Sequence, residues 1–459
     1  MKVTKIIENI FKNYLPSPFT IAILLTFFTI ILALVFTIPE NVTVYNYSLD
    51  IFKFWETGIW SNNLLVFAYQ MMLILVLGHV LVLSKPLSNA ILKITKYCTN
   101  TSTSAAIVAL LTMLVAFFNW GLGLIFGALL ARKVAEHAQK NKIELNYPII
   151  GAAGYVGLMV WHGGISGSAP IKINEENHIK NIMSSISSET FLDKIPNVID
   201  YSETVFSWWN LLIFAAILIV ITGTFYFLGK YTKPTKINLP TYKFSRTDGA
   251  TTKAEKLDSS KLLAIIFGVL VLITFTVRYL EDIKQLKITP NLINFLLFGL
   301  GIILHGSFKK FTNAIGESIT DISGILIQFP LYFGIMGIMN QSGMVNLISD
   351  FFVSVSTETT LPTYTFFSAA LVNIFVPSGG GQWVVQGPIV IESALQLGVP
   401  LPKVVMALAY GDQVTNMLQP FWALPLLGIT KLKAKEILPY TLIAMVVGSV
   451  IYITGLLLF

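Results

Sequence analysis

Long runs without a single charged side chain constrain this chain more than any other feature of its sequence. They include residues 13–39, 57–84, 97–131, 204–229, 322–349, 359–391 and 437–459. A helix needs about 20 mainly apolar residues to cross the hydrocarbon core of a bilayer, and these runs have that length. A soluble domain carries about a quarter charged residues, whereas this chain has 12%. The sequence therefore predicts an all-α polytopic membrane protein.

The charges that remain exclude several functions. The net charge of +7 sits in short loops beside the apolar runs, which is the pattern of topology-setting charge and not of a nucleic-acid surface. The single cysteine, Cys98, excludes a disulfide framework. The glycine run 379–381 is not followed by the Lys-Ser/Thr of a phosphate loop, and neither HExxH nor GxSxG occurs. We therefore expect no enzyme and no cofactor, apart from a bound Na⁺ discussed below.

The positive-inside rule gives a topology that needs two hairpins. Lysines at positions 2, 5 and 12 place the N-terminus in the cytoplasm. Nine full spans are predicted, near 15–38, 62–84, 147–170, 205–228, 262–280, 291–306, 322–340, 402–428 and 437–459. Basic loops flank segment 103–130 on both sides, so this segment enters from the cytoplasm and returns. Segment 363–395 must then be a second hairpin that enters from the outside and returns there, so that the loops after it lie on the sides that the positive-inside rule gives them.

Both predicted hairpins contain residues that interrupt a membrane helix. Asn119-Trp120-Gly121-Leu122-Gly123 lies in the middle of the first, and Pro377-Ser378-Gly379-Gly380-Gly381-Gln382 in the second. Irregular backbone at membrane depth is tolerated only where it is buried in protein or lines a wet cavity. The alternative for the first hairpin is a glycine-rich packing surface with a local exception to the charge rule.

The two halves of the chain repeat this pattern. Each hairpin is followed by a span interrupted by small polar residues and ending in proline; the interval from asparagine to proline is 51 residues for 119–170 and 47 for 373–420. We expect inverted repeats with these boundaries: an N-terminal span and outer loop (1–60), a first transport repeat (61–230), a cytoplasmic basic linker (231–261) and a second repeat (262–459).

Corresponding interruptions in opposed halves are the best sequence pointer to a transporter binding site. The substrate-binding candidates are Asn119, Gly121, Gly123, Gly164, Ser166, Ser168, Asn373, Ser378, Gly379, Gly380, Gln382, Thr415 and Asn416. Broken helices offer unpaired N–H groups to an anion, and freed carbonyls and amides to a cation. The polar side chains among them could instead only join helices.

Asp412 is the clearest acid within an apolar run, with no other charge between Val404 and Thr430. A charge at the bilayer centre costs about 2.5–3.5 kcal/mol on insertion scales, so such residues usually face a pathway or a partner. We expect Asp412, Gln413 and Asn416 to couple an ion, with Na⁺ near Asn119, Ser378 and Asp412. The alternative is a structural acid bonded to hairpin amides. His162 and His79 are interpreted as packing or interfacial histidines.

At these motifs the chain resembles the bacterial short-chain fatty acid transporter family of the ion transporter superfamily. The matching stretches are Leu15–Phe19, Asn119–Gly123, Gly163–Ser168, Val376–Trp383 and Gln419–Pro425, in family order along nearly the whole chain. The resemblance implies uptake of short carboxylates such as butyrate or acetoacetate across the bacterial cytoplasmic membrane. Because superfamily relatives are often dimers, it also implies a homodimer in membrane lipid.

The function expected from the residues and the resemblance together is a secondary active transporter. It would couple a short-chain monocarboxylate to Na⁺ or H⁺ by elevator or rocking-type alternating access. An anion channel for short carboxylates is the alternative, and an intramembrane enzyme lacks any nucleophile–base or metal pair at usable spacing.

Overall fold

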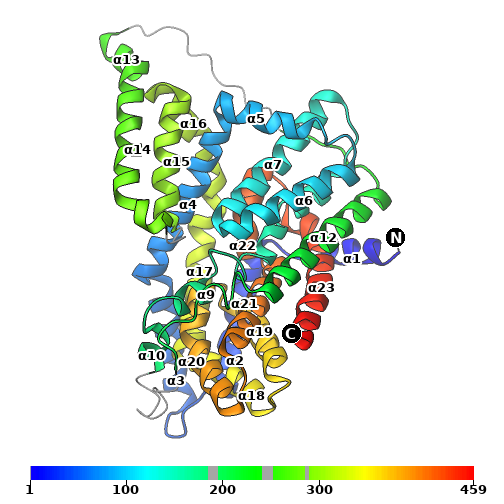
Figure 1. Ribbon diagram of the computed structural model, residues 1–459, viewed down its shortest axis with the longest axis vertical. Coiled ribbons are helices and arrows are strands. Elements are labelled where there is room, and N and C mark those ends of the chain that lie inside the picture. Colours follow the sequence, from blue (N-terminus) through cyan, green and yellow to red (C-terminus); the bar gives the residue numbers. More distant parts are fainter. Residues whose placement is uncertain (1, 184–194, 240–251, 285–288) are drawn as a thin grey trace.

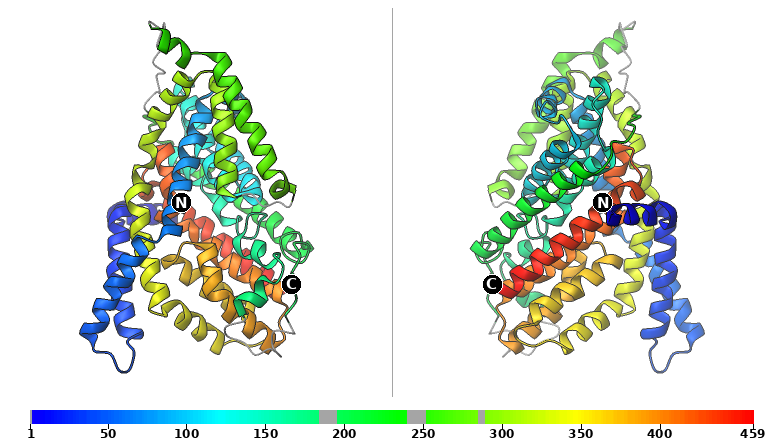
Figure 2. Two further views of the ribbon diagram at one scale, coloured as in Figure 1. Left: turned by 90° about the vertical axis from the view of Figure 1, so that its left-hand side faces the viewer. Right: turned by 90° about the vertical axis from the view of Figure 1, so that its right-hand side faces the viewer.

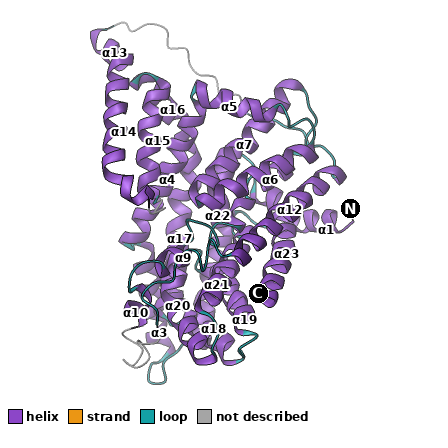
Figure 3. Cartoon of the chain, viewed as in Figure 1, coloured by secondary structure: helices purple, strands orange, loops and turns teal. Residues whose placement is uncertain are grey.

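The computed structural model describes residues 2–183, 195–239, 252–284 and 289–459, and every regular element in these ranges is a helix (Figure 3). Seven of the described helical segments are long and apolar enough to cross a membrane. The expected all-α polytopic membrane fold is therefore confirmed. Parts of the acidic loop 171–204 and of the linker 231–261 lie outside the described residues.

Most predicted spans form one helix each. These are α2 (Pro18–Phe36), α4 (Asn62–Leu83), α12 (Trp208–Tyr231), α14 (Lys261–Lys284), α15 (Pro290–His305), α17 (Ser323–Gln341) and α23 (Ala434–Leu458). Their starts follow local chemistry: the side chains of Ser17, Ser207 and Thr289 each cap the helix that begins after them. Apolar length therefore predicts these seven elements, and a polar cap marks the start of three of them.

Each of the two expected hairpins is a pair of helices joined by a very short connection. The first comprises α6 (Thr101–Phe118) and α7 (Trp120–Asn141), and the second α19 (Leu361–Phe375) and α20 (Gly379–Leu397). Asn119 is extended (φ −152°, ψ 125°), and its side-chain oxygen accepts a hydrogen bond from the N–H of Leu122, 3.0 Å away. Ser378 caps α20 in the same way through Gly381 N. That the hairpins are re-entrant, and that the halves are inverted repeats, stay predictions.

The spans near 147–170 and 402–428 are interrupted. The first consists of α8 (Tyr147–Ala153), a 3₁₀ turn η1 (Val156–Met159), an irregular stretch and α9 (Ser168–Ile173). The second consists of α21 (Leu401–Thr415), a 3₁₀ turn η3 (Asn416–Leu418) and α22 (Pro420–Thr430). The first break ends before Pro170, which lies inside α9, and the second is confined to four residues, 416–419. Gly411 to Thr415 are thus helical.

Several shorter helices lie outside the predicted spans and hairpins. They are α1 (Lys2–Tyr14), α3 (Val44–Ile59), α5 (Lys85–Thr95), α10 (His178–Met183), α13 (Lys253–Asp258), α16 (Phe308–Ser318) and α18 (Met344–Ser354). Helix α3 occupies most of the segment predicted as the outer loop after the first span. Charged residues interrupt the helix sequence, so it contains no long uncharged run. It nevertheless has an apolar face, on which Tyr47 and Ile51 are buried.

The helices form an elongated molecule in which the broken spans lie centrally. Figure 1 shows α14 and α15 beside α4 at one end and the pair α19–α20 with α18 at the other. Figure 2 shows α2 and α3 standing to one side, with α1 lying across the direction of its neighbours. Helix α21 packs against both α19 and α20, and α17 packs against α2 and α3. The second hairpin is therefore held directly against the second broken span.

Helices α3 and α17 approach each other through glycine. A Cβ added at Gly337 would lie 2.3 Å from the backbone oxygen of Phe54 and 2.8 Å from the Cα of Gly58. Backbone cannot move aside as a flexible side chain can, so this contact requires glycine on α17. Glycine–glycine contact of this kind is how membrane helices pack closely without a hydrophobic driving force.

Replacement of Gly337 by alanine should lower the melting temperature of the detergent-solubilised protein. Overpacking typically costs about 1–3 kcal/mol. Gly223 on α12 is the matched control, because a Cβ there meets nothing within 4 Å. Alanine has a higher helix propensity than glycine, and this gain is the same at both positions, so a difference in melting temperature reports the packing at Gly337. Equal melting temperatures for the two variants would contradict the close α3–α17 contact.

Candidate functional site

The two broken spans meet each other, and each meets a hairpin. Turn η1 contacts η3 and α21, while α9 contacts α20 and α21. Helix α22 of the second half packs on α7 of the first hairpin. In Figure 1 these segments lie together near the middle of the molecule. The interruptions that the sequence places some 250 residues apart therefore face one another.

A histidine and an aspartate join the two interruptions. His162 Nδ1 lies 2.5 Å from Asp412 Oδ2, and the two side chains are 0% and 1% exposed. The N–H of Ala169 donates to His162 Nε2 at 3.1 Å. Because Nε2 accepts this bond, it carries no proton, so the proton of the neutral ring is on Nδ1 and is donated to Asp412. The backbone of α9 thus sets the tautomer.

This assignment leaves Asp412 with one carboxyl oxygen that has no partner among the described residues. The imidazole is neutral in this arrangement, so the pair with an ionised Asp412 has a net charge of −1. Among the described residues, Asp412 Oδ1 is buried and has no hydrogen-bond partner. A buried carboxylate is costly unless it is paired or neutralised. The geometry therefore presents Oδ1 as the place where a proton or a metal cation would be stabilised.

The side chain of Gln413, on the second broken span, bonds the backbone of the first. Its Oε1 accepts from the N–H groups of His162 (2.8 Å) and Gly163 (3.0 Å), and the side chain is 1% exposed. Asn210 on α12 supports this stretch from the other side: its amide donates to Gly163 O at 3.0 Å, while its oxygen accepts from Tyr410 Oη at 2.6 Å. The irregular backbone after η1 is thus satisfied by side chains.

Asn373, near the end of α19, plays the corresponding role in the second half. Its amide donates to the backbone oxygen of Asp412 (2.6 Å), to Thr415 Oγ1 (3.0 Å) and to Asn416 Oδ1 (2.8 Å). The side-chain amide of Gln419 donates in turn to the backbone oxygen of Asn373. Carbonyls freed by the break at 416–419 are therefore bonded within the protein, as membrane depth requires.

The first hairpin is bonded to the first interruption in a similar way. Ser166 Oγ accepts from the N–H of Trp120 at 2.9 Å, and the N–H of Ile165 donates to Phe117 O at 2.8 Å. Asn119 is 1% exposed and caps α7. Candidates Asn119 and Ser166 thus lie side by side at the start of α7.

The second hairpin contacts the His162 ring through the first residue of α20. A Cβ added at Gly379 would lie 2.7 Å from His162 Cε1, so the start of α20 lies directly on the imidazole ring. The space beside Gly380 borders Ser168, whose Oγ is 3.8 Å from the position of an added Cβ. Ser378 precedes both glycines as the N-cap. The candidates of this turn therefore meet those of the first broken span.

Not every candidate belongs to this cluster. Gln382 donates to Ala369 O and to Gln386 Oε1, both within the second hairpin, so its amide joins helices. A Cβ at Gly123 would be 2.4 Å from that of Ala116, and one at Gly164 would be 2.4 Å from Phe117 O. These two glycines permit close packing, whereas Gly121 has no neighbour nearer than 3.5 Å.

Tryptophans surround the first interruption. Trp161 stacks on His162 with ring centroids 4.6 Å apart, and Trp120 lies 5.9 Å from Trp161 and 5.2 Å from Trp422. Trp383 instead donates to His178 Nε2 at 3.1 Å. Trp120 and Trp161 thus lie against the site, whereas Trp383 contacts α10.

Two participating residues were not among the sequence candidates. His162 was interpreted as a packing histidine, although its place next to Gly163 in an uncharged run is a signal that could have raised its weight. Tyr155 donates through its hydroxyl to Asn416 O (2.8 Å) and Gln419 O (3.1 Å). No local pattern distinguishes Tyr155 from other aromatic residues of the apolar runs.

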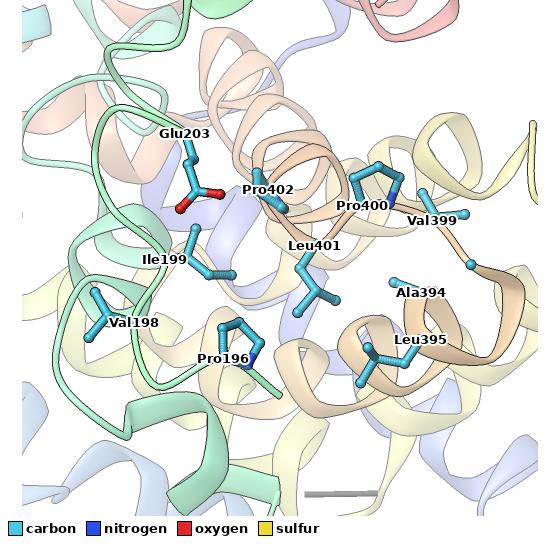
Figure 4. A pocket seen from close by; sticks show the side chains of 11 residues that line it. Pro196, Val198, Ile199, Glu203, Ala394, Leu395, Val399, Pro400, Leu401 and Pro402 are labelled. Atoms are coloured by element: carbon cyan, nitrogen blue, oxygen red, sulfur yellow. The ribbon is translucent and has the colours of Figure 1, made fainter. Parts of the chain in front are cut away.

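A cavity of about 400 Å³ lies apart from this cluster (Figure 4). Figure 4 shows Ala394 and Leu395 at the end of α20 facing Ile199 and Pro402, with Glu203 at one side. This is the end of α20 remote from Ser378 and its glycines. Within the described ranges no group of three or more His, Cys, Asp or Glu could hold a metal ion.

The fold and the cluster define a class: a multi-pass, all-helical membrane protein whose two interrupted spans meet around a buried acid. A family model described as "Short chain fatty acid transporter" matches residues 1–459. The chain belongs to this family, whose members are transporters and not enzymes.

Two curated relatives support the same assignment. A protein of Escherichia coli (strain K12) is 35% identical over 474 residues, covering 100% of this chain and 99% of its own length. A protein of Haemophilus influenzae is 34% identical over 462 residues, covering 99% of each. Both relatives are named for short-chain fatty acid transport.

Among solved structures the likeness is much weaker. The Neisseria gonorrhoeae antimetabolite efflux pump MtrF gives a TM-score of 0.40 at 16% identity, with 98% of this chain and 97% of that chain covered. The Alcanivorax borkumensis YdaH transporter gives 0.42 at 14% identity, with 96% and 98% covered. At these scores the likeness supports no assignment of function.

Replacement of Gln413 by leucine should lower the melting temperature, because two buried N–H groups would lose their acceptor. An unsatisfied buried polar group costs about 1–3 kcal/mol. Gln396→Leu on α20 is the control, since that side chain is exposed and its amide donates to Glu392 on the same helix. If both variants melted at the wild-type temperature, the bonds from His162 and Gly163 would not matter for stability.

Proposed function

We propose that this protein is a secondary active transporter that moves short-chain fatty acids together with a cation. The family supports the substrate class, a short monocarboxylate of the butyrate or acetoacetate type. The observation that carries the mechanism is the meeting of both interruptions and both hairpins around the His162–Asp412 pair. We place the protein in the bacterial cytoplasmic membrane with a cytoplasmic N-terminus, and as a homodimer.

The substrate carboxylate is best received by the starts of α7 and α20. The first N–H groups of a helix lack intrahelical acceptors, and the helix dipole adds positive potential there. Gly121 and Gly380 lie in these first turns, and a Cβ added at either would meet nothing nearer than 3.5 Å, so a small anion can reach the backbone there. At Gly379 the His162 ring occupies this space. Serines 166, 168 and 378 add hydroxyl groups beside the same turns.

A bound cation would reduce the electrostatic repulsion between the substrate and Asp412. A carboxylate substrate would approach a carboxylate that is already buried, and like charges at short range in a medium of low dielectric constant repel strongly. A cation at Asp412 Oδ1 removes one of the two charges. Substrate and cation then bind better together than either binds alone, which is a reciprocal coupling free energy.

H⁺ and Na⁺ both fit the oxygens that are present. A proton needs only Oδ1. For Na⁺, Asn373 Oδ1 and Gln419 Oε1 are further buried acceptors without a partner among the described residues. Asn119 and Ser378 each have a side-chain oxygen already capping a helix, with a second lone pair to offer. Alternating access, by elevator or rocking motion, would expose this set to each side in turn.

Asp412→Asn should abolish the dependence of butyrate uptake on cation gradients. The asparagine oxygen can still accept from His162, so the fold is retained while the charge is lost. We expect proteoliposome uptake driven by an imposed H⁺ or Na⁺ gradient to fall by about 5- to 150-fold, the usual span of coupling free energies.

The control for this substitution is Asp350→Asn, a change at an exposed acid of α18 that should transport as wild type. Applying H⁺ and Na⁺ gradients separately identifies the ion. Gradient-driven uptake that is unchanged in Asp412→Asn would remove the coupling role from this residue.

Counterflow distinguishes a carrier from an anion channel for short carboxylates. Vesicles loaded with unlabelled butyrate should accumulate labelled butyrate transiently, because a carrier returns through its cycle with substrate bound. A channel conducts without such exchange. Rapid equilibration without overshoot would favour the channel.

A further inference from the structure

A second cavity, of about 900 Å³, shares no lining residue with the candidate site. Three helix ends supply most of its lining: the end of α1, the last turns of α12 with the segment up to Thr235, and the first turns of α23. Asn146 and Pro148, at the start of α8, complete it. The sequence places all three ends on the cytoplasmic side. In Figure 1 they come together at the edge of the molecule marked by the N-terminus.

The lining is strongly basic. It includes Lys12, Lys233, Lys433 and Lys435 but only one acid, Glu436. Within the described ranges none of these lysines forms an ion pair, and Glu436 Oε2 accepts from the backbone N–H of Lys433 at 2.7 Å. Four cations gathered from three elements, without carboxylate partners, attract an anion of more than one charge or with several oxygens.

The backbone beneath two of these lysines is fixed. The side-chain amide of Asn146 donates to Lys233 O at 2.9 Å, and the N–H of Thr235 donates to Leu145 O at 2.9 Å. Lys433 is the N-cap of α23. The positions of the charges are thus held by folded structure and do not depend on a free loop.

The rest of the lining is apolar and faces outward. Phe227 is 55% and Tyr231 58% exposed, both on α12, and α12 is an apolar helix of membrane-spanning length. Next to the cavity, α1 exposes Ile6 (57%) and Ile10 (50%) along one side. An exposed apolar stripe on a lysine-bearing helix is typical of a segment that lies in the membrane interface.

We propose that this cavity binds the phosphate group of an anionic phospholipid from the cytoplasmic leaflet. The lysines would contact phosphate oxygens, and the acyl chains would run along Phe227 and Tyr231. A basic pocket between membrane helices whose outer wall is apolar suits a lipid headgroup better than a soluble phosphate, which gains nothing from that wall. The site joins α1, α12 and α23, so lipid there would fasten the N-terminal helix to the second half.

Lipid binding can be counted on the full-length protein by native mass spectrometry. Delipidated protein is titrated with dioleoylphosphatidylglycerol, with dioleoylphosphatidylcholine as the neutral lipid. Each lysine near a membrane surface contributes about 1 kcal/mol, so Lys12→Gln with Lys435→Gln should weaken phosphatidylglycerol binding by about 30-fold. Glutamine keeps most of the side-chain length and removes the charge.

The matched control is Lys309→Gln with Lys310→Gln, two lysines at the start of α16 that do not line this cavity. It should retain wild-type affinity. Equal loss in both double variants, or no loss in either, would overturn the proposal. A third arm titrates glycerol 3-phosphate: if it raised the melting temperature as much as the lipid does, the site would belong to a soluble phosphate.

Discussion

One carboxylate buried between two interrupted helices organises the centre of this protein. Asp412 accepts a hydrogen bond from Nδ1 of His162, and the backbone N–H of Ala169 donates to the other ring nitrogen. The neutral ring therefore orients the acid. A charge at this depth is costly unless it has a partner, and this cost is the physical basis of the proposed cation coupling.

The second constraint is that no backbone group can remain unsatisfied at membrane depth. Side chains from other elements bond three of the irregular places: Gln413 bonds the stretch after η1, Asn373 bonds the end of α21, and Ser166 bonds the start of α7. The start of α20 is capped by Ser378 from the same turn. The polar residues that could bind substrate therefore also hold the hairpins and broken helices in place.

Some of this could be predicted from the sequence, because the signals are local. Asn119 and Ser378 each have the side chain of a helix cap and glycines after them, and the structure turns the chain at both. Helix α3 was missed since Asp50, Lys53 and Glu56 break its apolar run. The contacts of the Gln382 amide could not be predicted, because a glutamine beside a glycine turn looks the same whether it points to the break or back into its own hairpin.

The sequence by itself determined the environment, the places where helices break and the presence of a lone acid, since length, charge and capping act between neighbours in the chain. Only the tertiary structure decided that Asp412 pairs with His162, 250 residues away, and that Oδ1 is the oxygen left open. It also decided that lysines from three helix ends share one cavity. Such pairings depend on how helices pack, and helix packing is set by shape over the whole molecule.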